Sequence, residues 1–342
     1  MTAVDRKHPG DSLKVQHNVF FIMAHQDIMT KPAYLCGLES AARLALQSNY
    51  RVTLFATDPT RIYNEWPLAA PLINICKVEL EGVYASTPLE DWFQSGAYRN
   101  STWVDQNLSN ALRLALVYKY GGTYLDLDTI TMSGEIFSER NTMGEVFEPE
   151  ENGINNHFFS FEQHHPLVHR LMEAFVQRFD GYTWAHNGPK LFKSVYDRLC
   201  KASNDAACRG VVIVPRHRHT PYDVYTGPQA LCTDWMINDA WERLMAESWL
   251  VHWSNSVFHK DLVLNGQEVF NVECYPPRSL LVKIMVHHCP VMNARLIPEF
   301  CDPNDPRFGP DAQDLITPPL TRVTAGVSGI AGPTPTRGKF KF

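Results

Sequence analysis

Two aspartates one residue apart, Asp126 and Asp128, are the strongest chemical signal in this 342-residue chain. They follow Thr123-Tyr124-Leu125, whose residue types favour an extended strand. Side chains two positions apart share one face of a strand, so both carboxylates are predicted to point the same way, while Leu127 turns into the core. Two hard oxygen ligands presented together suit a divalent cation that also holds a phosphate.

The residues before this pair must position it. Ser109 to Tyr120 has apolar residues at helical spacing, and Gly121-Gly122 then permit the left-handed backbone that ends many helices. An Asp-x-Asp sequence alone is common on solvated loops, but charged groups beside so much apolar sequence need partners or a metal. The helix, glycine break and strand therefore favour a metal and diphosphate site.

The chain resembles the α-1,4-glycosyltransferases over residues 18–290. Residues 109–128 match the family pattern S-D-A-x-R-x-A-x-x-x-x-x-G-G-x-Y-x-D-x-D, except that Asn110 replaces its first aspartate. Further segments agree in order, at 39–43, 89–92, 155–162, 184–189, 207–211 and 251–255. The last one departs from the family's His-x-Trp-Asn, because it reads His252-Trp253-Ser254-Asn255.

This resemblance implies an α/β, GT-A-like nucleotide-sugar transferase fold with a mostly parallel central sheet flanked by helices. It implies a retaining, metal-dependent transfer of galactose or an N-acetylhexosamine from a UDP-sugar, in α-1,4 linkage, to a terminal sugar of a glycosphingolipid or glycan. The implied partners are the UDP-sugar donor and the acceptor, and the implied location is the Golgi lumen. Because the leaving phosphate can help to deprotonate the acceptor in such enzymes, we name no general base.

The resemblance also implies roles for individual residues. Asp126 and Asp128 are expected to be the catalytic and metal-binding pair, with His252 as the third ligand. An imidazole is a softer donor than a carboxylate, so this set favours Mn²⁺ over Mg²⁺. The residues expected at the donor are Asn110, Arg113, Asn156, His186 and Asn255. The loop that carries His186 is expected to approach the diphosphate or the acceptor sugar, because it precedes a helix N-terminus.

Structural alternatives stay open for these residues. A salt bridge on a solvated helix face explains Arg113 about as well, and a simple turn explains Asn255. Capped loops would account for the segments around Asn156 and His186. A late histidine is commonly a core residue, and this chain has 14 histidines.

Other functions remain open or fit less well. A relative that binds nucleotide-sugar or glycan with weak or no catalysis is the main alternative, favoured by Asn110 and the displaced Trp253. A glycosidase needs a carboxylate pair but no metal–diphosphate site. A phosphoryl transferase should carry a glycine-rich loop with lysine, and none is visible. The net charge of −6, without a basic block, argues against nucleic acid as a partner.

Outside the central motif, strands and helices are predicted to alternate, as in an α/β sheet. The predicted strands are 19–23, 50–56, 73–80, 157–161, 211–214 and 250–253. The predicted helices are 35–46, 166–179, one opening at 189, and 279–288. The aspartate pair then follows a strand at its carboxyl end, where open α/β sheets bind ligands.

One catalytic domain is expected at 18–290, between a polar extension at 1–17 and a Pro-, Gly- and Thr-rich tail at 291–342 that we expect to be disordered. No run reaches the ~18 apolar residues of a membrane span, and the start lacks the apolar segment of a signal peptide. Family members carry an N-terminal anchor, so membrane contact is expected through the acceptor or through such an anchor.

The 8 cysteines are compatible with an oxidising compartment. Cys200 and Cys208 resemble a pair found in the family, and a disulfide would close the polar loop between them. Cys36 and Cys76 offer a second pair.

Overall fold

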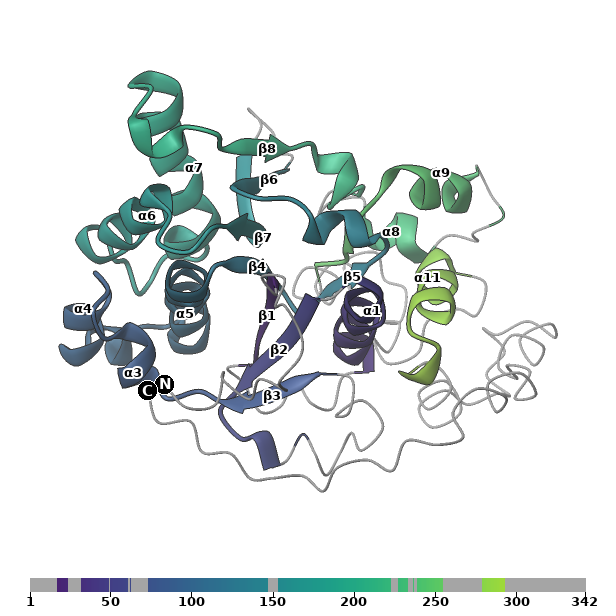
Figure 1. Ribbon diagram of the computed structural model, residues 1–342, viewed down its shortest axis with the longest axis horizontal. Coiled ribbons are helices and arrows are strands. Elements are labelled where there is room, and N and C mark those ends of the chain that lie inside the picture. The colour runs from purple at the N-terminus through teal and green to yellow at the C-terminus, as the bar shows by residue number, and fades with distance from the viewer. Residues whose placement is uncertain are drawn as a thin grey trace, which may run out of the picture.

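The structure, a computed structural model, describes residues 17–23, 32–48, 50–60, 62, 73–146, 153–222, 227–232, 236, 239–254 and 279–292. A seven-stranded sheet with the order β3-β2-β1-β4-β7-β6-β8 runs through it (Figure 1). Its strands are β1 (His17–Met23), β2 (Tyr50–Ala56), β3 (Asn74–Lys77), β4 (Gly122–Leu125), β6 (Thr142–Val146), β7 (Gly153–Phe161) and β8 (Val212–Val214).

Most neighbouring strands of this sheet are parallel. The strands from β3 through β2 and β1 to β4 pair in parallel, and so do β6 and β8. Only β7 runs against both of its neighbours, β4 and β6. The predicted α/β class with a mostly parallel sheet is therefore confirmed.

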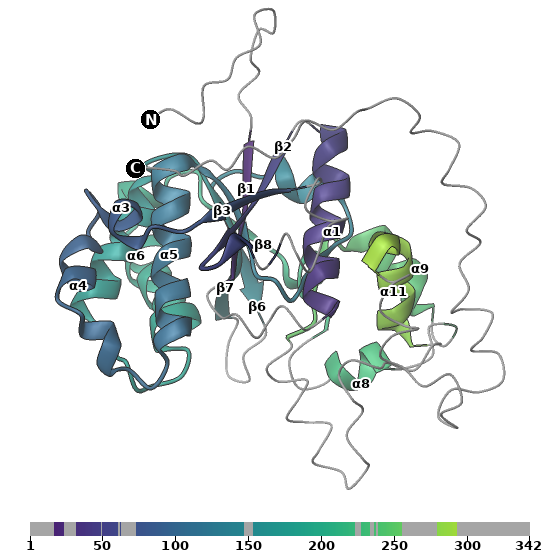
Figure 2. The ribbon, with the colours of Figure 1, turned by 90° about the horizontal axis from the view of Figure 1, so that it is seen from below.

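Helices cover both faces of the sheet (Figure 2). One face carries α1 (Pro32–Ser48) and α11 (Leu280–His288), with α8 (Gly227–Cys232) and α9 (Ala240–Glu247) beside them. The other carries α3 (Leu80–Tyr84), α4 (Glu90–Gln94), α5 (Val104–Tyr120) and α6 (Pro166–Gln177). Helix α7 (Leu191–Tyr196) packs in the same core as α5 and α6. Short 3₁₀ or π turns lie at Ala97–Asn100, Gly134–Phe137, His186–Lys190, Asp197–Ala202, Ala206–Cys208 and Arg216–Arg218.

Two separate hydrophobic cores result, and alternate residues of β1 contribute to each. Val19, Phe21 and Met23 pack in the core with α1. Phe20 and Ile22 pack in the core with α5 and α6. A strand with apolar residues on both faces is what a sheet covered on both sides requires.

A second, two-stranded sheet joins distant parts of the chain beside the aspartate pair. It consists of β5 (Thr129–Thr131) and β9 (Leu250–His252) in antiparallel pairing, with Thr129 opposite His252. The pairing continues beyond β9, because the Trp253 N–H donates to the Asp128 carbonyl at 3.1 Å. The late strand is therefore held against the turn that carries both aspartates.

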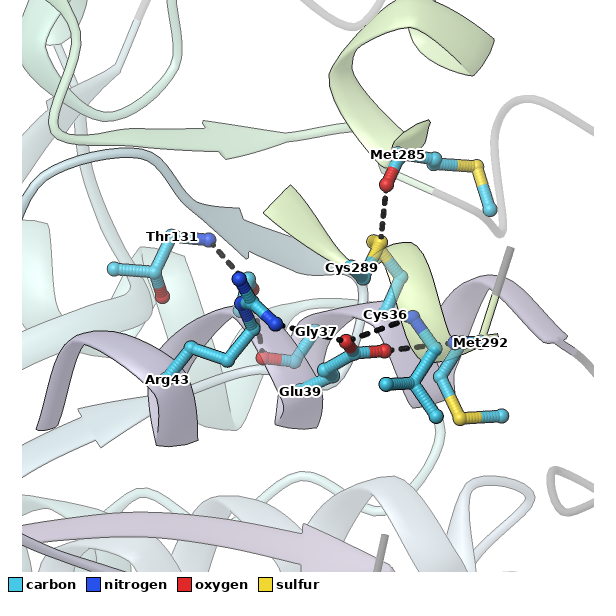
Figure 3. The surroundings of a disulfide bond; sticks show 10 residues. Cys36, Gly37, Glu39, Arg43, Thr131, Met285, Cys289 and Met292 are labelled. Carbon is cyan, nitrogen blue, oxygen red and sulfur yellow. Dashed lines mark hydrogen bonds and ion pairs between the residues drawn. A yellow bond between two sulfur atoms is a disulfide. The ribbon is translucent and has the colours of Figure 1, made fainter. Parts of the chain in front are cut away.

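Two disulfides are present among the described cysteines. Cys200–Cys208 forms as expected. The expected pairing of Cys36 with Cys76 is wrong, because Cys36 pairs with Cys289, 253 residues away (Figure 3). Cys36 belongs to α1 and is buried in the core on that face of the sheet. Cys76 packs on the core of the opposite face and is a free thiol.

The junction of α1 and α11 is also held by a buried carboxylate. Glu39 accepts the backbone N–H groups of Val291 and Met292 at 3.0 and 2.8 Å (Figure 3). Burial raises the pKa of Glu39, and these two hydrogen bonds oppose that rise. Together with the disulfide, they join the end of the described chain to α1.

The predicted elements are found, with shifted ends. The strand predicted at 73–80 stops at Lys77, and α3 begins at Leu80. Residues 1–16 and 293–342 lie outside the described residues, so the predicted extension and tail stay predictions. Within the part that is described, no helix combines the length and apolarity needed to span a bilayer.

Candidate metal and donor site

Asp126 and Asp128 lie in the turn that joins β4 to β5. Leu127 between them is buried, as predicted. Two hydrogen bonds hold the turn, because the Asp126 N–H donates to the His157 carbonyl of β7 at 2.8 Å and the Thr129 hydroxyl donates to the Asp126 carbonyl at 2.6 Å. A tight turn, rather than strand alternation, thus brings the two side chains together.

The side chains of Asp126, Asp128 and His252 gather at one point. Each offers one ligand atom, and these atoms all lie within 4.8 Å of one another. His252 Nε2 is 3.3 Å from Asp128 Oδ1, and all three residues are partly buried. Two carboxylates and one imidazole form a donor set that first-row divalent cations accept, so these residues fit a metal ion.

Arg113 of α5 holds the first aspartate in place. Its Nη1 atom is 3.0 Å from Asp126 Oδ1 and donates to the Asn156 carbonyl at 2.8 Å. The Tyr124 hydroxyl donates to the same Oδ1, and the guanidinium lies 4.3 Å from the centroid of the Tyr124 ring. The alternative of a salt bridge at Arg113 is therefore realised, but the arginine is buried rather than on a solvated face.

Burial and charge act in opposite directions on these side chains. Burial raises the pKa of Asp126, and the Asp128 charge adds to that rise, while Arg113 opposes it. Burial alone would lower the pKa of His252, but hydrogen bonding and charge from Asp128, with the charge of Asp126, hold it above its usual value. A cation that binds here must displace this favoured proton.

A second histidine supports the ring of His252. His157 of β7 stacks on it with centroids 4.1 Å apart and an interplanar angle of 13°. His157 Nε2 lies 3.1 Å from His219 Nδ1, and the Thr220 hydroxyl lies within 3.2 Å of both nitrogens. His219 Nε2 lies 3.2 Å from the Val214 carbonyl, which can only accept, so this nitrogen carries the proton.

Burial favours the neutral form of both supporting histidines. Burial lowers the pKa of His219 to about 3 and that of His157 well below its usual value. Sequence reasoning missed His219 and Thr220, since no motif marks them. The sequence feature that relates to His219 is Gly144. A β-carbon there would lie 2.5 Å from His219 Cε1, so the glycine leaves room for the imidazole ring.

Asn110 and Asn156 form a pair beside Arg113. Asn156 Nδ2 donates to Asn110 Oδ1 at 2.7 Å. Gly188 lies against both amides, because a β-carbon there would be 3.1 Å from the Asn156 amide and 3.2 Å from that of Asn110. Three of the segments expected at the donor therefore converge.

The contacts described for His186, which is also expected at the donor, do not include this group. His186 Nε2 lies 3.0 Å from the Arg178 carbonyl, and the contacts described for its ring join it to the loop rather than to the aspartates. Asn255 lies outside the described residues.

Comparisons with known proteins agree with this site. Residues 36–141 match the glycosyltransferase sugar-binding region containing the DXD motif. Residues 160–296 match the alpha 1,4-glycosyltransferase conserved region. The two regions include Asp126, Asp128 and His252.

Two groups of curated relatives are similar to parts of this chain. Lactosylceramide 4-alpha-galactosyltransferase from Homo sapiens is 29% identical over 213 residues, 60% of this chain and 59% of that protein. The protein of the same name from Pongo pygmaeus is 30% identical over 154 residues, 44% of this chain and 69% of that protein. Alpha-1,4-N-acetylglucosaminyltransferase from Homo sapiens is 26% identical over 234 residues, 63% of this chain and 66% of that protein. The chain thus spans less than two thirds of the length of several of these relatives.

Among solved structures, the PaToxG glycosyltransferase is similar with a TM-score of 0.42 and 13% identity, over 54% of this chain and 69% of that chain.

Proposed function

Since the chain belongs to the alpha-1,4-glycosyltransferase family, we propose that it is a retaining, metal-dependent transferase that uses a UDP-sugar. The transferred sugar is galactose or an N-acetylhexosamine, and the product is an α-1,4 linkage to a terminal sugar of a glycosphingolipid or glycan. The names of the relatives support both sugars, because one group is named for the transfer of galactose and the other for that of N-acetylglucosamine.

The observation that carries the proposal is the convergence of Asp126, Asp128 and His252. A divalent cation held there, with Mn²⁺ favoured by the imidazole, would neutralise the charge that develops on a diphosphate leaving group. Asp126 can keep its carboxylate oriented because Arg113 and Tyr124 both contact Oδ1. His252 is oriented by the stacked ring of His157.

The amides beside Arg113 are our proposed contacts to the donor sugar. Asn110 and Asn156 each carry donor and acceptor atoms that can pair with hydroxyl groups. Asn255 and His186 are proposed as further donor contacts because they lie in segments that match the family motifs. We also propose the Golgi lumen as the location, and the disulfides Cys36–Cys289 and Cys200–Cys208 fit an oxidising compartment.

A panel of UDP-sugars with Mn²⁺, offered with lactosyl and N-acetylhexosaminyl acceptors and analysed by mass, tests the proposal. We expect one donor to be transferred, with loss of transfer after chelation and restoration by Mn²⁺. Asp128→Asn should lower the rate by roughly 10²-fold or more, because one ligand charge is lost. Asp91→Asn, an exposed position on α4, is the matched control and should keep the rate.

Calorimetry with UDP and Mn²⁺ separates the proposal from its main alternative. Tight, metal-dependent UDP binding without transfer to any acceptor would identify a binding protein instead of an enzyme. Transfer that survives exhaustive chelation would contradict the role given to the three side chains.

A further inference from the structure

Two residues with exposed aromatic side chains are two positions apart in the loop before His186. Tyr182 is 70% exposed and Trp184 is 49% exposed. Such exposure is unusual for large aromatic residues, which normally bury most of their surface. Trp184 does not stand alone, because its ring contacts Trp103 at the start of α5, with centroids 4.6 Å apart and an interplanar angle of 66°.

The loop that presents these rings is firmly held. The Gly181 carbonyl accepts the Ser101 hydroxyl at 2.6 Å and the Thr102 N–H at 3.0 Å. The Tyr182 carbonyl accepts the indole N–H of Trp103 at 3.2 Å. Asp180 Oδ1 accepts the backbone N–H groups of Tyr182 and Thr183 at 2.7 and 3.1 Å. The aromatic side chains are therefore exposed on a fixed backbone.

Helix α5 connects this aromatic surface to the candidate metal site. Trp103, Asn107, Asn110 and Arg113 follow one another at spacings of four, three and three residues, so they share one helix face. Asn107 bonds to Ser101 and Asn187, Asn110 to Asn156, and Arg113 to Asp126. Trp103 and Arg113 are ten residue steps apart. At a rise of ~1.5 Å per residue, they lie roughly 15 Å apart along the helix axis.

The size of the surface indicates what it can bind. Two partly exposed aromatic side chains offer roughly 200–300 Å², since each can bury 150–250 Å² in full. A stable protein interface needs about 800 Å² per partner. One or two pyranose rings match this area, because a pyranose has hydroxyl groups around its edge and apolar C–H groups on its faces that can lie on an aromatic ring.

We propose that Trp184 and Tyr182 form an acceptor platform, on which a hexose of the acceptor oligosaccharide lies with its C–H face against the Trp184 ring. The inference rests on the proposed transferase function, and names the part of the acceptor that binds away from the reacting hydroxyl. Continuity along α5 with Asn110 and Arg113 argues for the acceptor rather than for an unrelated ligand.

The test compares Trp184→Ala, Tyr182→Ala and the conservative Trp184→Phe with wild type. For Trp184→Ala we expect the acceptor KM to rise about tenfold, the order expected for loss of one aromatic contact. Trp184→Phe should restore part of this loss. The donor KM and the affinity for UDP with Mn²⁺ should stay unchanged. Met245→Ala removes an exposed apolar side chain from α9 and is the control.

Binding of the free oligosaccharide, measured by saturation-transfer NMR on wild type and Trp184→Ala, separates the two proposals. Binding that needs Trp184 without any transfer would support the platform and contradict the transferase. Transfer with an unchanged acceptor KM in both alanine variants would overturn the platform. A fall in UDP affinity that equals the rise in acceptor KM would also overturn it, because Trp184 would then serve the donor. Loss of binding to phosphatidylcholine vesicles with an unchanged KM for a soluble acceptor would instead identify a lipid contact.

Discussion

Gly37 of α1 lies so close to the turn between the two aspartates that a β-carbon there would stand 2.5 Å from the Leu127 carbonyl oxygen. The Thr129 carbonyl oxygen would be 2.6 Å away. Ser40, one helical turn later, accepts the backbone N–H of Thr131 at 3.0 Å. Helix α1 is thus a close support for the turn that carries the candidate metal ligands.

Gly37→Ala should therefore damage the metal site. The atoms in conflict belong to the backbone and cannot rotate away, so α1 or the turn must move. We expect about 1–3 kcal/mol of destabilisation, as for overpacking in a core, and a shift of half-activation to higher Mn²⁺. Melting temperature and Mn²⁺ titration measure the two effects.

Gly210→Ala is the matched control for this substitution. Its φ of +76° makes the change strained, but nothing lies within 4 Å of the added carbon. It should lower the melting temperature and leave the metal titration unchanged. If both variants shift the titration equally, Gly37 has no special relation to the site.

Arg113→Lys should lower the transfer rate strongly although it keeps the charge. An ammonium group cannot reach Asp126, Asn156 and Ser109 together as the guanidinium does. Each hydrogen bond to the charged group that the substitution removes costs about 1.5–3 kcal/mol. Steady-state kinetics and thermal melting should both show the loss. Arg170→Lys in the exposed pair with Glu173 should change neither, and an unchanged Arg113→Lys enzyme would contradict the anchoring role.

Asn110→Asp should alter donor choice or raise activity. The aspartate keeps an oxygen that can accept the Asn156 amide, now 2.7 Å from Asn110 Oδ1, so the fold should tolerate the change. It loses the amide N–H donors, so the ionised side chain can only accept hydrogen bonds from sugar hydroxyls. Rates with a set of UDP-sugars provide the measurement. An unchanged donor profile would remove Asn110 from the sugar contact.

His252→Ala should weaken metal and UDP binding while the protein remains folded. Asp126 and Asp128 remain as ligands, so the loss should be partial and half-activation should move to higher Mn²⁺. His164→Ala, a change of a histidine outside the site, is the control for metal titration. A lower melting temperature with an unchanged Mn²⁺ titration would make His252 a core residue only.

Local sequence patterns were enough to predict most of the fold and the centre of the site. The aspartate pair, its strand and its helix are contiguous, so residue types at 109–128 determine them together. Apolar runs predicted β1, β2 and β7, because they fill cores on both faces of the sheet. The short β5 and β6 were not predicted, since three to five residues without a distinct period give little signal.

The remaining parts of the site depend on tertiary contacts that local patterns do not contain. The sequence suggested Cys76 as the partner of Cys36, and only the position of the two side chains in opposite cores excludes that pair. The stack of His157 on His252 requires β7 and β9 to meet, although 95 residues separate them along the chain (252 minus 157). Neither relation follows from residue type or spacing.

Acid should destabilise the protein through its buried neutral histidines. Burial, with a smaller effect of Arg140, lowers the pKa of His17 to about 3, and burial lowers that of His219 to about 3. The unfolded chain takes up these protons near pH 6.5, whereas the folded protein does not. Stability should therefore be unaffected by these two groups above pH 6.5 and should fall as the pH drops below it, by about 1.4 kcal/mol per pH unit for each histidine.

The pair of His252 with Asp128 acts with the opposite sign and in a different range. Since the pKa of His252 is raised, the stabilising effect of its protonated form without metal is complete below pH 6.5. This effect is lost as the pH rises through the pKa of His252 in the folded protein. It adds no slope between pH 6.5 and 5. Urea unfolding of wild type and a His17 variant in that window therefore isolates the contribution of His17. His17→Gln keeps a polar partner for the Thr123 hydroxyl and should make the pH dependence shallower by one proton. Parallel slopes in wild type and His17→Gln would show that His17 is protonated in the folded state.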